Sequence, residues 1–455
     1  MERDDPGATP PRGPRHTGRA MRGTATLRAL RSRNYRLYFG GQGISLVGTW
    51  IQTIALSWLV YTMTRSPFLL GLVGFSAQIA TFVLAPVAGV VADRLNRHRL
   101  IVATQSLFAL QATALGVLVL AHAIAVWHII VLSALLGIVN AFDMPTRQAF
   151  VVEIIEARED LPNAIALNSS MFNGARLVGP AVAGILIAAV GEGMCFVINA
   201  ASYLAVIAAL LAMRIAPRRR ETQTRHVWSE LREGFRFTFG FAPTRAIILL
   251  LALVSLAGMP YATLMPIFAA QILHGGASTL GFLAGAGGVG ALIGAVALAS
   301  RNTVLGLGRW IPAASSAFGL ALIGFSFSRW LPLSLLLLAL AGLGMITHMA
   351  SSNTILQTIV DDSRRGRVMS FYTMAFIGVA PFGSLIGGAL AGRIGAPYTV
   401  MLGGLVCIAG AAAFARKLPE LRRLVRPIYR QRGIIPELAT GVQSATDVAT
   451  RSERR

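Results

Sequence analysis

Charged residues are scarce in this sequence, and their scarcity excludes most soluble folds. Asp, Glu, Lys and Arg together make up 13% of the 455 residues, whereas globular proteins contain about 25%. Hydrophobic residues make up 55%, and the mean hydropathy is +0.63. A soluble chain of this composition would expose a large apolar surface to water. The composition therefore indicates a polytopic membrane protein.

Cysteine and lysine are nearly absent, which limits the chemistry available to the chain. Cys195 and Cys407 both lie in apolar stretches, and no C-x-x-C pair occurs, so metal or redox sites are not expected. Lys417 is the only lysine, and no G-x-x-x-x-G-K-[ST] loop binds ATP here. No Ser/His/Asp constellation stands out. We therefore expect no enzyme activity, no metal and no cofactor, with a proton gradient as the energy source.

Long apolar stretches recur along the chain. A helix that spans the hydrocarbon core needs about 20 apolar residues. Twelve stretches qualify, at residues 36–63, 67–92, 99–121, 125–147, 163–190, 193–214, 246–272, 278–299, 307–328, 330–358, 368–392 and 395–415.

Basic residues alternate between the two sides of these stretches. With both termini inside, the external turns carry only Arg65, Arg329 and Arg393, while most other arginines fall on internal turns and tails. The positive-inside rule therefore predicts an all-α membrane protein of twelve spans with cytoplasmic termini. The net charge of +22 then reflects topology, so no nucleic-acid partner is expected.

The chain divides near its middle. In the segment 216–244, Trp228, Leu231, Phe235 and Phe239 recur at helical spacing, which predicts an amphipathic helix on the inner membrane surface. A soluble linker helix is the alternative. The predicted parts are a cytoplasmic basic tail (1–35), an N-terminal six-helix bundle (36–214), a cytoplasmic linker (215–245), a C-terminal six-helix bundle (246–415) and a second cytoplasmic basic tail (416–455).

The two halves resemble each other. The segment 136–146 is similar to 343–353 at an offset of 207, and Gly184 corresponds to Gly388 at an offset of 204. Two similar halves joined by a basic linker indicate pseudo-symmetric repeats around a central path.

The turn between the second and third spans, "GVVADRLNRHRL" (89–100), resembles the loop signature of the major facilitator superfamily, G-x-x-x-D-R-x-G-R-x-R. Asn96 replaces the usual glycine, and Asn tolerates a left-handed turn better than most residues. Gly89 lets another helix pack closely, and Asp93 can accept helical N–H groups or pair with arginine. The resemblance implies a cytoplasmic gate between the halves; simple positive-inside charge is the alternative. The matching residues are Gly89, Asp93, Arg94, Arg97 and Arg99.

Four further segments, 46–74, 143–155, 161–186 and 264–269, are similar to the exporter branch of that superfamily that includes the enterobactin exporter. The resemblance extends over residues 28–415. It implies the major facilitator fold and proton-driven export of a small amphipathic, siderophore-like or drug molecule by alternating access. The expected setting is the bacterial inner membrane, with the bilayer and a small-molecule substrate as partners and a monomeric protein.

Two other functions stay open. One is a multidrug exporter of broad specificity, or an importer. The other is a non-transporting membrane receptor or scaffold that uses the basic tails and the linker.

Arg176 is a charge near the middle of the long fifth span, about 13 residues from its start. Such a charge is costly unless it faces a partner or a water-filled path, so a functional site is the default interpretation. Ser169 and Asn173 lie on the same helix face and complete a polar stripe that can bind an anionic or oxygen-rich substrate. A structural anchor to backbone carbonyls is the alternative.

The segment "NAFDMPTR" places Asn140, Asp143 and Arg147 on one helix face, with Asp143 and Arg147 at the spacing of an ion pair. Pro145 weakens the helix between them. We expect Asp143 and Arg147 to belong to the cytoplasmic gate, with an Asp93–Arg147 pair as a second arrangement. A static cap of the fourth span is the alternative.

The fifth span resembles the drug/proton antiporter motif G-x-x-x-G-P-x-x-G-G at Ala175, Gly179, Pro180 and Gly184, with alanine in place of its first glycine. Proton coupling needs a titratable group. Asp143 and His348 are the candidates, and His348 is expected to face the substrate stripe from the other half. A buried histidine that is simply hydrogen-bonded is the alternative.

Overall fold

The computed structural model describes residues 27–155, 157–214, 227–301 and 303–435. Within these ranges every regular element is a helix, and eleven apolar helices are long enough to cross a membrane. The all-α prediction is therefore confirmed for the part of the chain that the structure describes.

The first half folds into one bundle. Ser32, Ser66 and Asn96 each precede a long helix and accept a hydrogen bond from the backbone N–H three residues later, which satisfies an otherwise unpaired donor. The elements are η1 (Arg28–Arg31), α2 (Arg33–Thr64), α3 (Pro67–Arg94), α4 (Arg97–Leu120), α5 (Val126–Ile154), η2 (Arg158–Asp160) and α6 (Leu161–Leu211).

Helix α6 contains two membrane spans. Its 51 residues would reach about 77 Å as one straight helix, more than twice the roughly 30 Å of the hydrocarbon core. Gly191 interrupts it with φ 79° and ψ 170°, a conformation open essentially to glycine alone. Counting the two parts separately gives the twelve spans that the sequence predicts.

The second half folds into a similar bundle with more interruptions. Its seventh and eleventh spans are each assembled from a pair of α-helices and one π-helical turn, and each has a proline at the start of an α-helix, where no backbone N–H is needed. The elements are α7 (Val227–Gly240), α8 (Ala242–Gly258), α9 (Pro260–Ile267), η3 (Phe268–Ile272), α10 (Ala277–Ala299), α11 (Leu307–Phe327), α12 (Leu331–Ile359), α13 (Asp362–Thr373), η4 (Met374–Gly378), α14 (Ala380–Ile394) and α15 (Ala396–Gln431).

The two bundles meet along two helix pairs, α6 with α10 and α3 with α14. Glycines make both contacts possible. A Cβ on Gly184 would lie 2.7 Å from a carbonyl oxygen of α10, and a Cβ on Gly388 would lie 2.6 Å from one of α3. Gly281 and Gly71 occupy the opposing positions. The repeat inferred from the sequence is therefore present as two equivalent contacts between the bundles.

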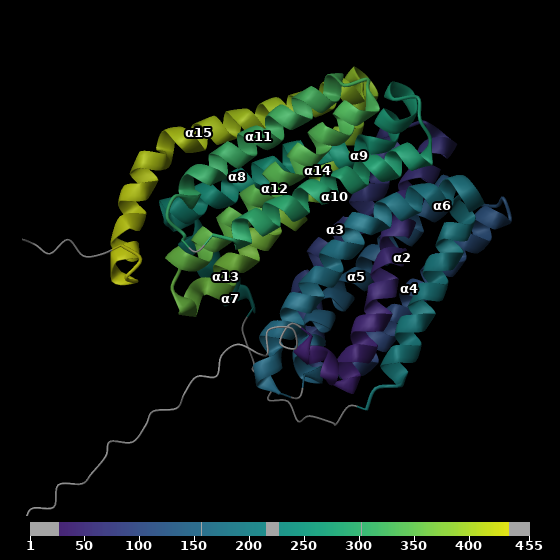
Figure 1. The fold of residues 1–455 in the computed structure, drawn as a ribbon, viewed down its shortest axis with the longest axis horizontal. Coiled ribbons are helices and arrows are strands. Elements are labelled where there is room, and N and C mark those ends of the chain that lie inside the picture. The colour runs from purple at the N-terminus through teal and green to yellow at the C-terminus, as the bar shows by residue number, and fades with distance from the viewer. Residues whose placement is uncertain (1–26, 156, 215–226, 302, 436–455) are drawn as a thin grey trace, which may run out of the picture.

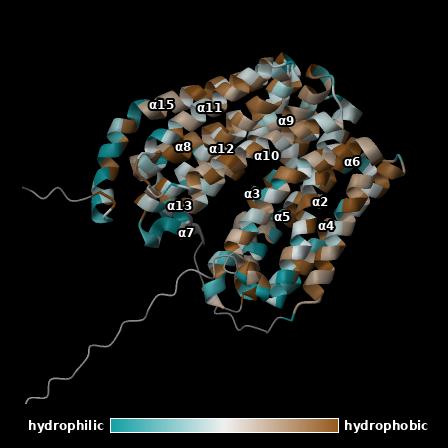
Figure 2. Cartoon of the chain, in the orientation of Figure 1, coloured by the Kyte–Doolittle hydropathy of each residue, from teal (hydrophilic) through white to brown (hydrophobic). Residues whose placement is uncertain are grey.

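Figure 1 shows the two bundles side by side, close together near α9 and α6 and diverging toward the end where α7 and α13 lie. The hydrophilic segments gather at that diverging end, whereas the middle of the spans is hydrophobic (Figure 2). The close contacts of α3 and α14 begin at Pro67, directly after the turn that carries Arg65. The bundles are therefore in contact on the side that the charge pattern assigns to the exterior.

The linker helix predicted from the sequence is present as α7, but it packs on the protein. The rings of Phe235 and Phe239 lie 6.1 and 6.2 Å from that of Phe371 in α13. Glu233 forms an ion pair with Arg367 of α13 at 2.7 Å. The side chains of Trp228 and Leu231 lie outside the described part, so the membrane-surface orientation stays a prediction.

Each of the two tails predicted from the sequence is helical where it adjoins the neighbouring span. Helix α2 starts at Arg33, ahead of the predicted boundary at residue 36, and α15 continues to Gln431 beyond the predicted boundary at 415. At 36 residues, α15 is about 54 Å long. Its last part therefore extends past the hydrocarbon core. Residues 1–26 and 436–455 lie outside the described ranges.

Candidate functional site

The predicted polar stripe lies on the first half of α6. Ser169 and Asn173 are exposed and Arg176 is partly exposed, so the three share an accessible helix face. The Asn173 amide donates to the backbone carbonyl of Ser169 at 2.9 Å. The stripe therefore offers the Arg176 guanidinium, the Asn173 amide oxygen and the Ser169 hydroxyl to a ligand.

Arg176 lies where α6 first meets the other bundle. Pro180 has no N–H, so the carbonyl of Arg176 lacks its usual helical donor. That carbonyl faces α10, where a Cβ on Gly288 would lie 3.2 Å from the oxygen. The backbone of Arg176 thus lies where α6 packs against α10 of the other bundle.

No carboxylate neutralises this charge within the described part of the chain. Each ion pair found there joins other residues, and none includes Arg176. A guanidinium in a spanning helix without an acidic partner is suited to bind an anionic group.

The small residues of the fifth span pack as the sequence predicts. Ala175 is buried, and a Cβ on Gly179 would overlap Trp50 of α2. Gly184 and Pro180 face α10 of the other bundle. The resemblance to the antiporter motif therefore corresponds to two close helix contacts, one within a bundle and one between bundles.

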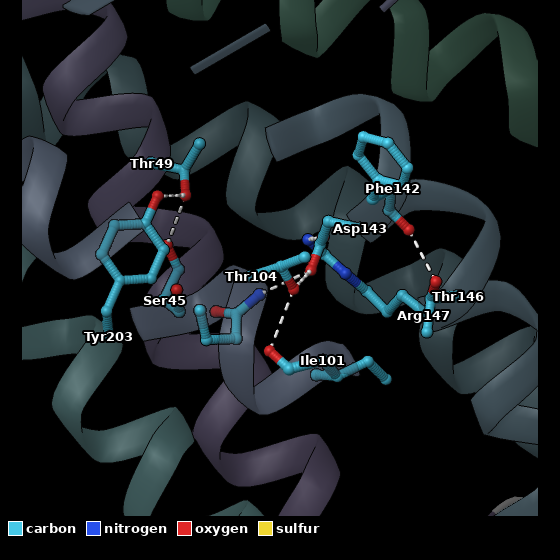
Figure 3. Close-up of polar contacts among 10 residues, drawn as sticks. Ser45, Thr49, Ile101, Thr104, Phe142, Asp143, Thr146, Arg147 and Tyr203 are labelled. Carbon is cyan, nitrogen blue, oxygen red and sulfur yellow. Dashed lines mark hydrogen bonds and ion pairs between the residues drawn. The ribbon is translucent and has the colours of Figure 1, made fainter. Parts of the chain in front are cut away.

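Asp143 is the centre of a buried polar network in the N-terminal bundle (Figure 3). Its carboxylate accepts hydrogen bonds from the Thr104 hydroxyl at 2.8 Å and the Gln105 amide at 2.9 Å, both in α4. It also pairs with Arg147 one helical turn away. The ion pair predicted from the spacing is therefore present, whereas its role in a gate stays a prediction. Arg147 makes this pair within its own helix. The Asp93 side chain lies outside the described part of the structure, so the Asp93–Arg147 arrangement stays a prediction.

The turn after α3 is held to its own bundle. Arg97 lies 3.6 Å from Glu153 of α5, and the His98 ring is 2.8 Å from the Leu210 carbonyl of α6. Arg94 is exposed. The backbone of Asp93 belongs to the last turn of α3, but its side chain lies outside the described part of the structure.

One expectation about this turn is wrong. Asn96 is not left-handed: its φ is −67° and ψ 112°, and its side chain caps α4 by accepting from the Arg99 N–H at 3.1 Å. An asparagine serves here because it is a good N-cap. Gly89 has no described atom within 4 Å of the place of a Cβ in this conformation, so its close packing in a closed cytoplasmic gate stays a prediction.

His348 does not face the polar stripe as expected. It is fully buried between α11 and α12, and its Nδ1 lies 2.8 Å from the Ser315 hydroxyl. Gly344 of α12 packs against α11. His348 follows four residues later and lies on the same helix face, so it points into the C-terminal bundle. Its Nε2 has no hydrogen-bond partner among the described atoms.

The sequence analysis missed a second buried network in the N-terminal bundle. The Asn199 amide donates to Gln52 at 2.7 Å, and the Gln52 amide donates to Gln111 at 2.9 Å, which links α6, α2 and α4. Each of the three is at most 3% exposed. Uncharged amides inside three apolar spans were the available signal, because a buried amide requires a partner.

The comparisons with known proteins agree with this geometry. Residues 24–433 match the model of the family described as transmembrane secretion effector. The chain belongs to that family of the major facilitator superfamily.

Relatives of the transporter are membrane transport proteins. It is 26% identical to the staphyloferrin A transporter of Staphylococcus aureus, over 85% of this chain and 97% of that one. It is also 26% identical to the multidrug efflux pump Tap of Mycolicibacterium fortuitum, over 84% and 95%. The superfamily and the exporter-like branch inferred from the sequence are thereby confirmed.

Solved structures share the fold of the transporter. A bacterial homologue of the lysosomal transporter Spinster, in an inward-facing conformation, superposes with a TM-score of 0.65 at 14% identity, over 88% of this chain and 98% of that one. A bacterial homologue of ferroportin, also inward-facing, gives 0.65 at 16% identity, over 85% and 98%. The protein is thus a multi-pass secondary transporter with the major facilitator fold.

Proposed function

We propose that this transporter exports a small anionic, siderophore-like molecule from the cytoplasm by alternating access. The observation that carries the proposal concerns Arg176, whose backbone lies at the contact between the two bundles. Its guanidinium has no acidic partner among the described residues. An anionic substrate supplies the missing counter-charge. Asn173 and Ser169 add hydrogen bonds on the same face. The similarity to a staphyloferrin A transporter supports this substrate class.

The energy source in this proposal is the proton gradient. Asp143 and His348 are buried titratable side chains within the spans. One of them takes up a proton while the transporter faces outward and releases it to the cytoplasm after the transporter has returned to the inward-facing state. The charge pattern supports cytoplasmic termini. With the bundles in contact on the outer side, the described conformation is the one that loads substrate from the cytoplasm.

The test uses transport by inside-out membrane vesicles with an acidified lumen, in which an exporter accumulates its substrate. A carboxylate siderophore is the probe. Arg176→Ala is expected to reduce uptake about 100-fold, because the charge that pairs with the substrate is lost. Arg176→Lys keeps the charge and is expected to retain part of the activity. Arg329→Ala, an exposed arginine outside the stripe, is the matched control.

Two results would contradict the proposal. Uptake by Arg176→Ala at the wild-type rate removes this residue from the substrate site. Uptake that persists after a protonophore collapses the gradient removes proton coupling.

Efflux of lipophilic drugs is a second candidate function. It is favoured by the aromatic pair of Tyr261 and Phe318, whose rings lie 6.1 Å apart edge to face, and by the similarity to multidrug efflux pumps. A cationic dye tested in the same vesicles separates the two. If drugs are the substrates, Arg176→Ala leaves dye uptake unchanged or increases it, because a positive charge repels the dye.

A further inference from the structure

A pocket of about 410 Å³ lies at the end of the C-terminal bundle, away from the substrate stripe. It is enclosed by α8, the start of α11 and the extended part of α15. Its floor is apolar and includes Ile311, Leu421 and Val425, each at most 9% exposed. This volume lies in the range of small-molecule sites.

Three arginines line the rim of the same pocket. Arg309 belongs to the first turn of α11, and Arg422 and Arg426 lie one turn apart on α15. All three are exposed, and the lining contains no Asp or Glu. The charges of Arg309 and Arg422 are close enough to repel each other. Among the described residues none of the three forms an ion pair, so the rim lacks a counter-charge.

The extension of α15 builds this pocket. Leu421, Val425 and Tyr429 recur at a spacing of four and line the pocket wall. Proline at 419 breaks the hydrogen-bond ladder where the helix leaves the apolar region. The helix turns at this end, and the turned part is hydrophilic (Figures 1 and 2). The Arg432 guanidinium donates to the Val360 carbonyl at 3.0 Å, which fastens the end of the extension to α12.

We propose that this pocket binds an anionic phospholipid of the inner leaflet, with the phosphate between Arg309, Arg422 and Arg426 and an acyl chain along the apolar floor. The pocket lies at the ends of the ninth and twelfth spans that carry the basic residues, which is the level of the inner lipid headgroups. Basic pockets between spanning helices on this side are suited to phospholipid headgroups. An apolar floor beside a basic rim matches a molecule that is apolar at one end and anionic at the other.

The experiment measures lipid binding to the purified full-length protein by native mass spectrometry. Phosphatidylglycerol is the probe, and phosphatidylcholine with the same acyl chains is the neutral comparison. The pocket variant carries Arg309→Gln, Arg422→Gln and Arg426→Gln. It is expected to bind phosphatidylglycerol on the order of 100-fold more weakly, because three phosphate contacts are lost. All three residues are exposed, so folding should be preserved; thermal unfolding without added lipid checks this.

The matched control removes the same amount of charge, all of it from α15. It carries Arg416→Gln, Arg423→Gln and Arg430→Gln, which are exposed residues outside the pocket lining. This control is expected to bind phosphatidylglycerol as the wild type does. If the pocket triple variant unfolds, the single Arg422→Gln variant is compared with Arg423→Gln in the same way.

Three outcomes overturn the proposal. Equal losses in the pocket and control variants indicate general surface attraction. Equal binding of phosphatidylcholine by the wild type indicates a groove without charge selectivity. Displacement of phosphatidylglycerol by millimolar inorganic phosphate indicates a site for a free anion. Selective binding that is lost only in the pocket variant supports the lipid site.

Discussion

Two charged side chains within the spanning helices differ in what surrounds them. Asp143 is fully buried and is satisfied by Thr104, Gln105 and Arg147. Arg176 is partly exposed and has no acidic partner in the described part of the chain. A satisfied buried charge stabilises one arrangement of a bundle, whereas an unpaired accessible one is available to a ligand. The Asp143 network therefore stabilises the described arrangement of the N-terminal bundle, whereas Arg176 is the residue that the proposed function gives to the substrate.

The Asp143 network makes a prediction about stability. Asp143→Asn keeps the size of the side chain but leaves Arg147 without its carboxylate inside the bundle. We expect the free energy of unfolding in detergent to fall by about 2–3 kcal/mol, somewhat below the cost for a fully buried pair because Arg147 is partly exposed. The measurement is denaturant unfolding followed by tryptophan fluorescence.

A matched control is available in the Asp362–Arg365 pair of α13, where Asp362 is 83% exposed. Asp362→Asn is expected to change stability by less than about 1 kcal/mol. Adding Arg147→Gln to Asp143→Asn should recover part of the loss. If the free energy of unfolding of Asp143→Asn equals that of the wild type, the Asp143–Arg147 pair does not stabilise the bundle.

At this scale the sequence predicts contacts within one helix better than contacts between helices. The Asp143–Arg147 pair follows from a spacing of four residues, and it is present. The orientation of His348 depends on which face of α12 packs against α11, and a single sequence does not specify that. Asn96 shows a third case, in which the residue that replaces the family glycine has a capping role of its own.

At the scale of helices, the contact between the bundles depends on the absence of side chains. Gly281 of α10 lies against the Pro180 carbonyl of α6, where a Cβ would be 2.5 Å from the oxygen. The Gly71–Gly388 contact of α3 and α14 is its equivalent. Both contacts must open if the transporter is to face outward. Glycine at these positions therefore sets how closely the outer ends can approach.

This geometry predicts the effect of a single methyl group. Gly281→Ala is expected to disfavour the described conformation by about 1–3 kcal/mol, the typical cost of overpacking, which changes the conformational equilibrium by roughly 5- to 150-fold. Gly392→Ala in α14 is the control, since no described atom lies within 4 Å of its Cβ position.

The measurement is the distance between spin labels on the external turns, at His122→Cys in the N-terminal bundle and Arg329→Cys in the C-terminal bundle, with both native cysteines replaced by alanine. Gly281→Ala should shift the distribution to longer distances, and Gly392→Ala should not. Identical distributions for both variants would show that the glycine contact does not limit closure.

The helices themselves were largely predictable, and their departures have physical causes. Apolar length predicts each span, but it does not show that Gly191 alone separates the fifth and sixth spans. Nor does it show that a π-turn ends the seventh span and that another divides the eleventh. The α7–α13 contact and the extension of α15 to Gln431 arise from tertiary packing of amphipathic segments. Their hydrophobic periodicity shows an apolar face without identifying its partner.

At the scale of the whole molecule, the two bundles are joined by a linker and by helix contacts near their outer ends. Offsets of 207 and 204 residues between similar segments predict this pseudo-symmetry, and the paired glycine contacts realise it. In the proposed alternating-access cycle, transport requires these bundles to separate on the outer side and to close on the inner side. Fixing the outer contact should therefore stop transport without disturbing either bundle.

A cross-link between α3 and α14 can hold the outer contact closed. The rings of Phe75 and Phe382 lie 5.8 Å apart across the two bundles, so Phe75→Cys with Phe382→Cys can be bridged by a short, reducible thiol cross-linker in a protein without its native cysteines. Each single-cysteine variant serves as the control. Cross-linking is expected to abolish siderophore counterflow in proteoliposomes, and reduction is expected to restore it. Counterflow at the uncross-linked rate in the bridged protein would show that transport does not require the bundles to separate on the outer side.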